Sequence, residues 1–187
     1  MKKTLCLIFS ILFVLSFAGC KIRNKEEDRP TLDTDASGVD IIKYAKKGKI
    51  PELKYALGDD ADAIIAALED DEDEAFSIMD GDEYTTIITP DNANLVFETD
   101  SKEKKIKYIV SFGKSYGFEN EVDPNTVSEV MDKKGYSAKL SSIPEKLMQF
   151  VPASANCDCL SYTVSGYSLN FVFDNNYLAA TILYKKG

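Results

Sequence analysis

The sequence predicts an α+β fold: two tandem helix-then-three-strand repeats forming one antiparallel sheet, with helices on one face. Two observations predict this class. Segments with apolar residues at helical spacing precede three alternating segments, and this order occurs twice. The middle alternating segments also match, since Leu95–Asp100 and Leu169–Asp174 share the pattern L-x-F-x-x-D. The alternative is a chance similarity between two amphipathic hairpins.

The first repeat is expected to begin with two short helices. Residues 39–47 suit a helix that ends at Gly48, and residues 58–69 suit a second helix. Either Asp59 or Asp60 can cap the second helix, whose apolar residues fall on one stripe. Alternating segments bounded by turn residues then predict three strands. These are Tyr84–Thr89, Asn94–Asp100 and Lys105–Phe112.

The second repeat is expected to follow the same order. Asp123 opens a helix that stops at Gly135, and residues 143–151 form another short helical stretch. Three strands follow at Leu160–Ser165, Ser168–Asp174 and Tyr177–Lys185. A three-stranded sheet alone has too little core to be stable, so the two sheets are expected to pair. The expected core comprises Leu95, Phe97, Tyr108, Val110, Phe112, Leu169, Phe171, Phe173, Ile182 and Tyr184.

The N-terminus predicts an exported, lipid-anchored protein. Lys2 and Lys3 precede an apolar run from Leu5 to Phe17, and small residues lead directly to Cys20. This resembles the lipobox of bacterial lipoproteins, although Phe17 stands where Leu is usual. The resemblance implies cleavage of residues 1–19 and lipidation of Cys20, which would hold the protein on the extracytoplasmic face of the cell membrane. The alternative is an ordinary secretory signal with an incidental Cys.

The remaining chain is expected to contain a tether and one domain. Residues 20–38 are polar, with few aromatic or β-branched residues, and predict a flexible segment. Residues 39–187 predict a single α+β domain made of two repeats, at about 39–118 and 119–187. An apolar content of 44% is too high for a disordered chain of 187 residues.

Charge and composition argue against several function classes. There are 22 basic and 31 acidic residues, a net charge of −9, which disfavours a nucleic-acid partner. Residues 1–19 contain two lysines and no acid, so their removal leaves 20 basic and 31 acidic residues, a net charge of −11. The chain has no His, which removes Ser–His and Cys–His nucleophile pairs and imidazole metal ligands. We therefore expect no enzyme activity, no cofactor and no metal site.

Two clusters of residues are candidates for a metal or redox site. The acidic stretch 69–74 lacks the spacing of an EF-hand loop and is expected to be a solvated loop rather than a calcium site. Cys157 and Cys159 are a single C-x-C pair, which is a weak metal signal. They are expected to be thiols or a local disulfide, and a redox or metal role is the alternative.

Two stretches resemble a known family. Residues 44–51 with Leu57–Asp59, and the closing segment from Tyr162 through Phe171–Asp174, resemble the YjgB-like exported lipoproteins of Gram-positive bacteria over about residues 40–187. The repeated helix-then-hairpin order also resembles the β-lactamase-inhibitor-protein fold and small outer-membrane assembly lipoproteins. The YjgB-like family has no established activity, so the resemblance implies a fold and an exported lipoprotein, but no reaction.

The candidate functional surface is the outer face of the sheet. Its mixture of small polar and aliphatic residues, including Ile109 and Val172, is less charged than a solvated face requires. Tyr116, Phe118 and Tyr167 lie in expected loops beside glycines and are candidate aromatic anchors. These features predict a non-enzymatic binding or interaction module at the cell envelope, with a protein or cell-wall partner. The alternative is an inhibitor-like or assembly-assisting lipoprotein.

Overall fold

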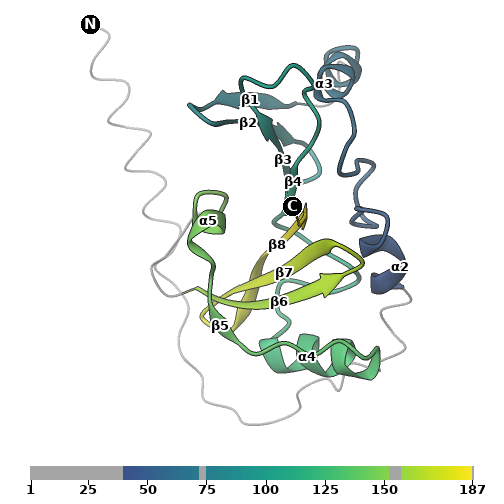
Figure 1. The fold of residues 1–187 in the computed structure, drawn as a ribbon, viewed down its shortest axis with the longest axis vertical. Coiled ribbons are helices and arrows are strands. Elements are labelled where there is room, and N and C mark those ends of the chain that lie inside the picture. The colour runs from purple at the N-terminus through teal and green to yellow at the C-terminus, as the bar shows by residue number, and fades with distance from the viewer. Residues whose placement is uncertain (1–39, 72–74, 152–156, 187) are drawn as a thin grey trace, which may run out of the picture. The chain divides into compact units, whose positions relative to one another are not determined.

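The centre of the molecule is one antiparallel sheet of eight strands, in the order β1-β2-β3-β4-β8-β7-β6-β5 (Figure 1). The computed structural model describes residues 40–71, 75–151 and 157–186. The predicted signal peptide, Cys20 and the tether lie outside the described residues. The strands are β1 (Ser77–Asp80), β2 (Tyr84–Thr89), β3 (Ala93–Glu98), β4 (Tyr108–Ser111), β5 (Ser141–Ser142), β6 (Asp158–Val164), β7 (Tyr167–Asp174) and β8 (Tyr177–Lys185).

Within the described residues four short helices accompany the sheet, and aspartates cap three of them. The helices are α2 (Ile41–Ala45), α3 (Ala61–Glu69), α4 (Pro124–Lys133) and α5 (Glu145–Met148). The carboxylates of Asp40, Asp60 and Asp123 each accept the backbone N–H three residues later, at 3.0, 3.1 and 2.8 Å. These bonds satisfy N–H groups that lack a partner within the helix. No helix in the described ranges is long and apolar enough to cross a membrane.

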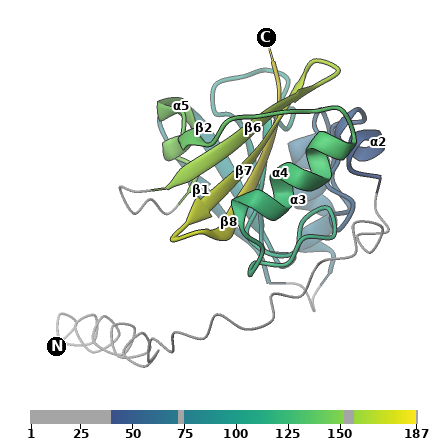
Figure 2. The same ribbon diagram turned by 90° about the horizontal axis from the view of Figure 1, so that it is seen from below.

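The prediction of two tandem repeats with helices on one face is wrong. The eight strands form one contiguous sheet, and β1 and β5 belong to neither predicted set of three strands. Residues of α2, α3 and α4 pack on one face, here called the three-helix face, which carries Leu95, Ile109, Phe171 and Leu183. Leu147 of α5 packs on the opposite face, the α5 face, with Val96, Val110, Val172 and Ile182. Figure 1 shows α4 and α5 on opposite sides of strands β6–β8, and Figure 2 shows α4 lying across these strands.

The expected core was assigned to the wrong face in β4 and β8. Ile109 pairs with Leu183 on the three-helix face, whereas Val110 pairs with Ile182 on the α5 face. The sequence interpretation placed Val110 and Ile182 in the helix-covered core, with Ile109 outside. All four side chains are fully buried. Because both faces are apolar, alternation shows that a strand is present but not which face its residues occupy.

The three-helix face is organised around Phe171. Its ring makes edge contacts with Tyr116, Phe118 and Tyr162, at centroid distances of 6.3, 5.6 and 6.1 Å. Phe171 is fully buried, as are Tyr116 and Phe118. Edge-to-face pairs at these distances add stabilisation beyond the burial of area. Phe171 therefore links β6, β7 and the 115–118 turn.

Replacing Phe171 should destabilise the fold strongly. We expect Phe171→Ala to lower the free energy of unfolding by about 3–5 kcal/mol, because it removes three ring contacts and leaves a cavity. Urea unfolding followed by far-UV circular dichroism measures this. Tyr177→Ala is the control, since Tyr177 is 60% exposed in the β7–β8 turn region, and it should change stability by less than about 0.5 kcal/mol. Equal losses in both variants would contradict this account of the core.

Candidate binding groove

Four of the five predicted binding residues are buried. Ile109, Tyr116, Phe118 and Val172 have no exposed surface, whereas Tyr167 is half-buried. Val172 packs on the α5 face and the other three buried residues pack on the three-helix face. The prediction of an exposed outer face with Tyr116 and Phe118 at its rim is therefore wrong, because side chains cover both faces here.

A tight turn explains why Tyr116 and Phe118 point inward. Ser115 and Phe118 exchange backbone hydrogen bonds of 3.0 and 2.9 Å, and Tyr116 and Gly117 both have positive φ values of 52° and 78°. The Glu52 carboxylate accepts the N–H groups of Tyr116 and Gly117 at 2.9 and 2.7 Å. The Tyr116 hydroxyl donates to a backbone carbonyl at 2.6 Å. The turn is thus fixed to the 49–52 segment, and its aromatic side chains fill the core.

The sheet divides at its centre, next to the start of β4. Strands β4 and β8 pair over only four residue pairs, from Tyr108 with Tyr184 to Ser111 with Thr181. Before Tyr108 the chain turns away from β8: the Ile106 N–H donates to the Asp59 carbonyl at 3.0 Å. Strand β8 instead continues to Lys185, where it pairs with Tyr167 of β7. The two halves of the sheet therefore separate beyond the Tyr108–Tyr184 pair.

A groove of about 600 Å³ lies where the halves separate. Strands β2, β4 and β7 begin at this end of the sheet, and β3 and β8 end there. The lining residues come from these strand ends and from the loops beside them. They are Leu57, Gly58, Tyr84, Glu98, Lys105, Ile106, Lys107, Tyr108, Tyr167, Lys185 and Lys186.

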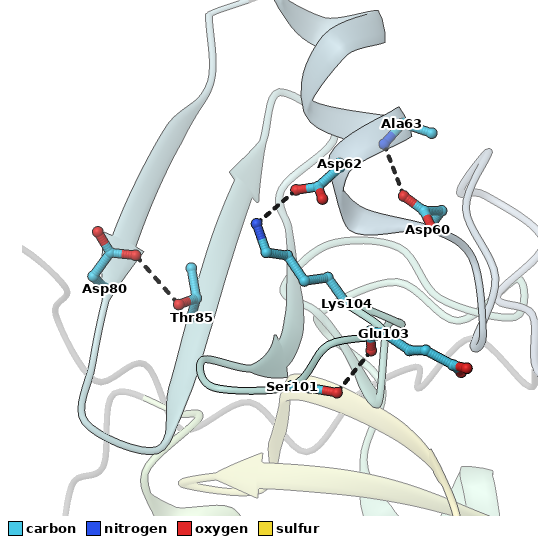
Figure 3. Close-up of polar contacts among 8 residues, drawn as sticks. All are labelled: Asp60, Asp62, Ala63, Asp80, Thr85, Ser101, Glu103 and Lys104. Carbon is cyan, nitrogen blue, oxygen red and sulfur yellow. Dashed lines mark hydrogen bonds and ion pairs between the residues drawn. The ribbon is translucent and has the colours of Figure 1, made fainter.

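One wall of the groove is fixed by contacts to the start of α3. Lys104 reaches Asp62 at 2.9 Å, as Figure 3 shows, and Lys105 reaches Asp60 at 3.1 Å. Asp60 also caps α3 by accepting the Ala63 N–H. The Ala63 N–H and the Lys105 ammonium hold the pKa of Asp60 below its ordinary value. Asp60 therefore stays ionised, and its ion pair with Lys105 positions residues 105–107, which line the groove.

Tyr167 forms part of the facing wall. It lies against Gly48, where a Cβ atom would stand 3.2 Å from the ring and 3.1 Å from the Cβ of Leu57. Gly48 also has a φ of +67°, which disfavours any larger residue. Tyr167 is the only one of the five predicted binding residues that lines the groove.

The groove is positively charged although the chain is acidic. Its lining contains four lysines and one glutamate, in a chain of net charge −9. Lys105 is paired with Asp60, and Lys107 lies 3.9 Å from Glu98, at the outer limit of an ion pair. Lys186 donates to the neutral hydroxyl of Thr163 at 2.7 Å, a contact that leaves its charge uncompensated. The sequence placed only Lys107 on the candidate surface, the outer sheet face, and the lysines come from separate segments.

Two of the tyrosines that line the groove pack against each other. Tyr84 and Tyr108 meet edge to face at 5.7 Å. Burial, together with hydrogen bonding to Tyr84, raises the pKa of Tyr108 to about 12. The lining therefore offers ammonium groups, phenol rings with hydroxyls, and the partly buried apolar side chain of Leu57. This combination suits recognition of an anion attached to a partly apolar body.

Neither the Cys157–Cys159 pair nor the described part of the acidic stretch lines the groove. Residues 72–74 of the acidic stretch lie outside the described residues, and within the described ranges no three acidic or sulfur side chains gather around a common point. Cys157 and Cys159 are both buried. Burial raises the pKa of the Cys159 thiol to about 11, which makes it a poor nucleophile and a poor metal ligand.

Comparison with known proteins gives one informative result. No protein-family model matches the sequence, and no curated protein sequence matches it. The fold is similar to the crystal structure of YjgB, a DUF4309 family protein from Bacillus subtilis subsp. subtilis str. 168. The TM-score is 0.51 with 15% sequence identity, over 82% of this chain and 97% of that chain. At this identity the likeness shows a shared fold.

The Cys159 thiol should react slowly. At pH 8 a thiol with a pKa near 11 is about one part in a thousand thiolate, so we expect alkylation at least about 100-fold slower than for an ordinary thiol. The rate should rise with pH until about pH 11. Iodoacetamide labelling followed by mass spectrometry, in a chain with Cys6, Cys20 and Cys157 changed to Ala, measures it. Urea-unfolded chain is the control, and equal rates in the two states would contradict the prediction.

Proposed function

We propose that this chain is a non-enzymatic binding module of the bacterial cell envelope, held at the membrane by lipid on Cys20. Its groove would engage a component of the cell wall. The observation that carries the binding proposal is the lysine- and tyrosine-lined groove at the division of the sheet, in a chain that is otherwise acidic. We also propose that the chain is a YjgB-like exported lipoprotein, which the shared fold supports together with the N-terminal sequence.

The size of the groove favours a wall component over a protein partner. A volume of about 600 Å³ lies within the range of pockets that hold small ligands, about 300–1,000 Å³. A stable protein interface instead buries about 800 Å² on each partner. The predicted interaction residues Ile109 and Val172 are buried, so neither is available to a protein partner. A few sugar or polyol units of a longer polymer would fit the groove.

The anchor would keep this groove close to the wall. We propose that residues 21–38 act as a polar tether: a flexible chain of that length would span on the order of 25 Å root-mean-square, which would lift the domain from the membrane surface. Two acyl chains on Cys20 would hold it there stably, whereas a single chain would bind reversibly. The proposal therefore places a tethered domain between membrane and wall.

Replacing Cys20 should abolish lipidation. The full chain, expressed in a Gram-positive bacterium fed an alkyne fatty acid, should be labelled and should sediment with membranes. Cys20→Ser should be unlabelled and should leave the membrane fraction, because the acceptor thiol is absent. Cys6→Ser is the control, since Cys6 precedes the expected cleavage site. Labelling of Cys20→Ser at the wild-type level would contradict the anchor.

Shortening Tyr167 should weaken wall binding. We expect the full chain in mild detergent to sediment with isolated Gram-positive cell walls, and Tyr167→Ala to lower the apparent affinity by about tenfold, because a half-buried aromatic wall of the groove is lost. Tyr177→Ala is the matched control, since Tyr177 is exposed and does not line the groove. Wild-type protein that stays in the supernatant, or equal losses in both variants, would contradict wall binding through the groove.

A further inference from the structure

We propose that the ligand of the groove is an anionic polyhydroxyl polymer: a chain of sugars or polyols bearing phosphodiester or carboxylate groups. This inference rests on the proposed function, because it names the chemical class that the same groove would bind. The lysines would bind the acidic groups, and Tyr167 with Leu57 would pack against the carbon skeleton.

The positions of Lys107 and Lys185 indicate an anionic ligand. Lys107 and Lys185 each lie one residue beyond the Tyr108–Tyr184 pair, on the two strands that separate there. Both line the groove. Like charges on neighbouring strands destabilise a sheet unless something compensates them. Glu98, which lies 3.9 Å from the Lys107 ammonium, compensates part of this charge, and an anion bound between the separating strands would compensate the rest.

Lys186 adds a second positive group on the β8 side. Its ammonium donates to the Thr163 hydroxyl, and its backbone N–H donates to the Gly166 carbonyl at 2.8 Å, so the residue is held in place. Although burial would raise it, the pKa of Tyr184 is lowered, because Ser168 and Lys146 hydrogen-bond its oxygen and the charges of Lys146 and Lys186 lie nearby. The environment at this end of β8 is therefore electropositive.

The apolar lining indicates more than a free anion. The Tyr167 ring rests on Gly48 and also lines the groove. A tyrosine presents an apolar ring and a polar hydroxyl together, which suits the alternating C–H and O–H groups of a sugar or polyol. A site for inorganic phosphate alone would not need this surface. The groove thus combines charge recognition with a surface for a carbon skeleton.

The acidic remainder of the chain disfavours nucleic acid as the polymer. A duplex carries one negative charge per about 1.7 Å, which a chain of net charge −9 repels outside the groove. A polymer with more widely spaced charges meets less repulsion. Single-stranded DNA, whose bases could stack on tyrosine, is therefore included in the test as a competing polyanion.

The test measures binding of the full chain in detergent micelles to four immobilised polymers. These are poly(glycerol phosphate), polygalacturonate, neutral dextran and single-stranded DNA. We expect binding to at least one of the first two, at least about tenfold weaker binding to dextran and DNA, and weakening by salt. The two anionic arms distinguish a phosphodiester from a carboxylate ligand.

Paired charge reversals locate the binding site. Lys107→Glu with Lys185→Glu should weaken polymer binding by at least about tenfold, the size expected when one charge-assisted hydrogen bond is lost. Lys43→Glu with Lys139→Glu is the matched control: both residues are exposed, neither lines the groove, and the net charge changes equally. The control should bind as wild type, and thermal unfolding should show that both variants are folded.

The remaining outcomes would overturn either the anionic class of the ligand or the groove as the binding site. Stronger binding of dextran than of the anionic polymers, lost on Tyr167→Ala, would overturn the anionic class while leaving wall binding by the groove in place. DNA bound as tightly as the anionic polymers would also overturn the class. Equal weakening by both lysine pairs would overturn the groove as the site, and with it the proposed function. No binding to any polymer would overturn this inference, whereas sedimentation with cell walls tests the proposed function separately.

Discussion

The four residue pairs between β4 and β8 are the constraint on which the rest of the structure depends. They join β1–β4 to β5–β8, and they carry both apolar layers across the junction. On the three-helix face Ile109 meets Leu183, and on the α5 face Val110 meets Ile182. Because this pairing is so short, the two halves of the sheet separate beyond the Tyr108–Tyr184 pair. The groove and the lysines on its two sides result from the end of the β4–β8 pairing at Tyr108.

The local signals in the sequence located most of the elements. The alternating segments at Tyr84–Thr89 and Tyr177–Lys185 have the bounds that were predicted. Asp123 caps its helix as expected, and of the two candidates Asp59 and Asp60 it is Asp60 that caps α3. The arrangement of the elements was not predictable from the same signals. Strands buried on both sides lack the polar alternation that marks an outer face, so the sequence does not show that side chains cover both faces. The similarity of the two hairpins was interpreted instead as a repeat with helices on one face. The two strands that were missed, β1 and β5, are exposed or very short.

The candidate site was only partly predictable, for a related physical reason. Tyr116 and Phe118 sit beside glycines, as surface anchors often do, but Glu52 binds their turn from a segment 64 residues away and directs them inward. That long-range contact has no local signal in the sequence. Tyr167 was identified because it lies in an expected loop beside a glycine, and the structure places it at the start of β7. The lysines come from the β3–β4 loop and the end of β8, and only the folded sheet brings them together.

Amide NMR of the isotope-labelled protein during titration with poly(glycerol phosphate) and polygalacturonate tests most directly the claim that this division of the sheet is a binding site. The account predicts that shift changes centre on residues 105–108, Tyr167 and residues 184–186, the segments that meet where β4 and β8 separate. Changes confined to the exposed edge strand β1 or to α4, with none in the groove, would contradict it.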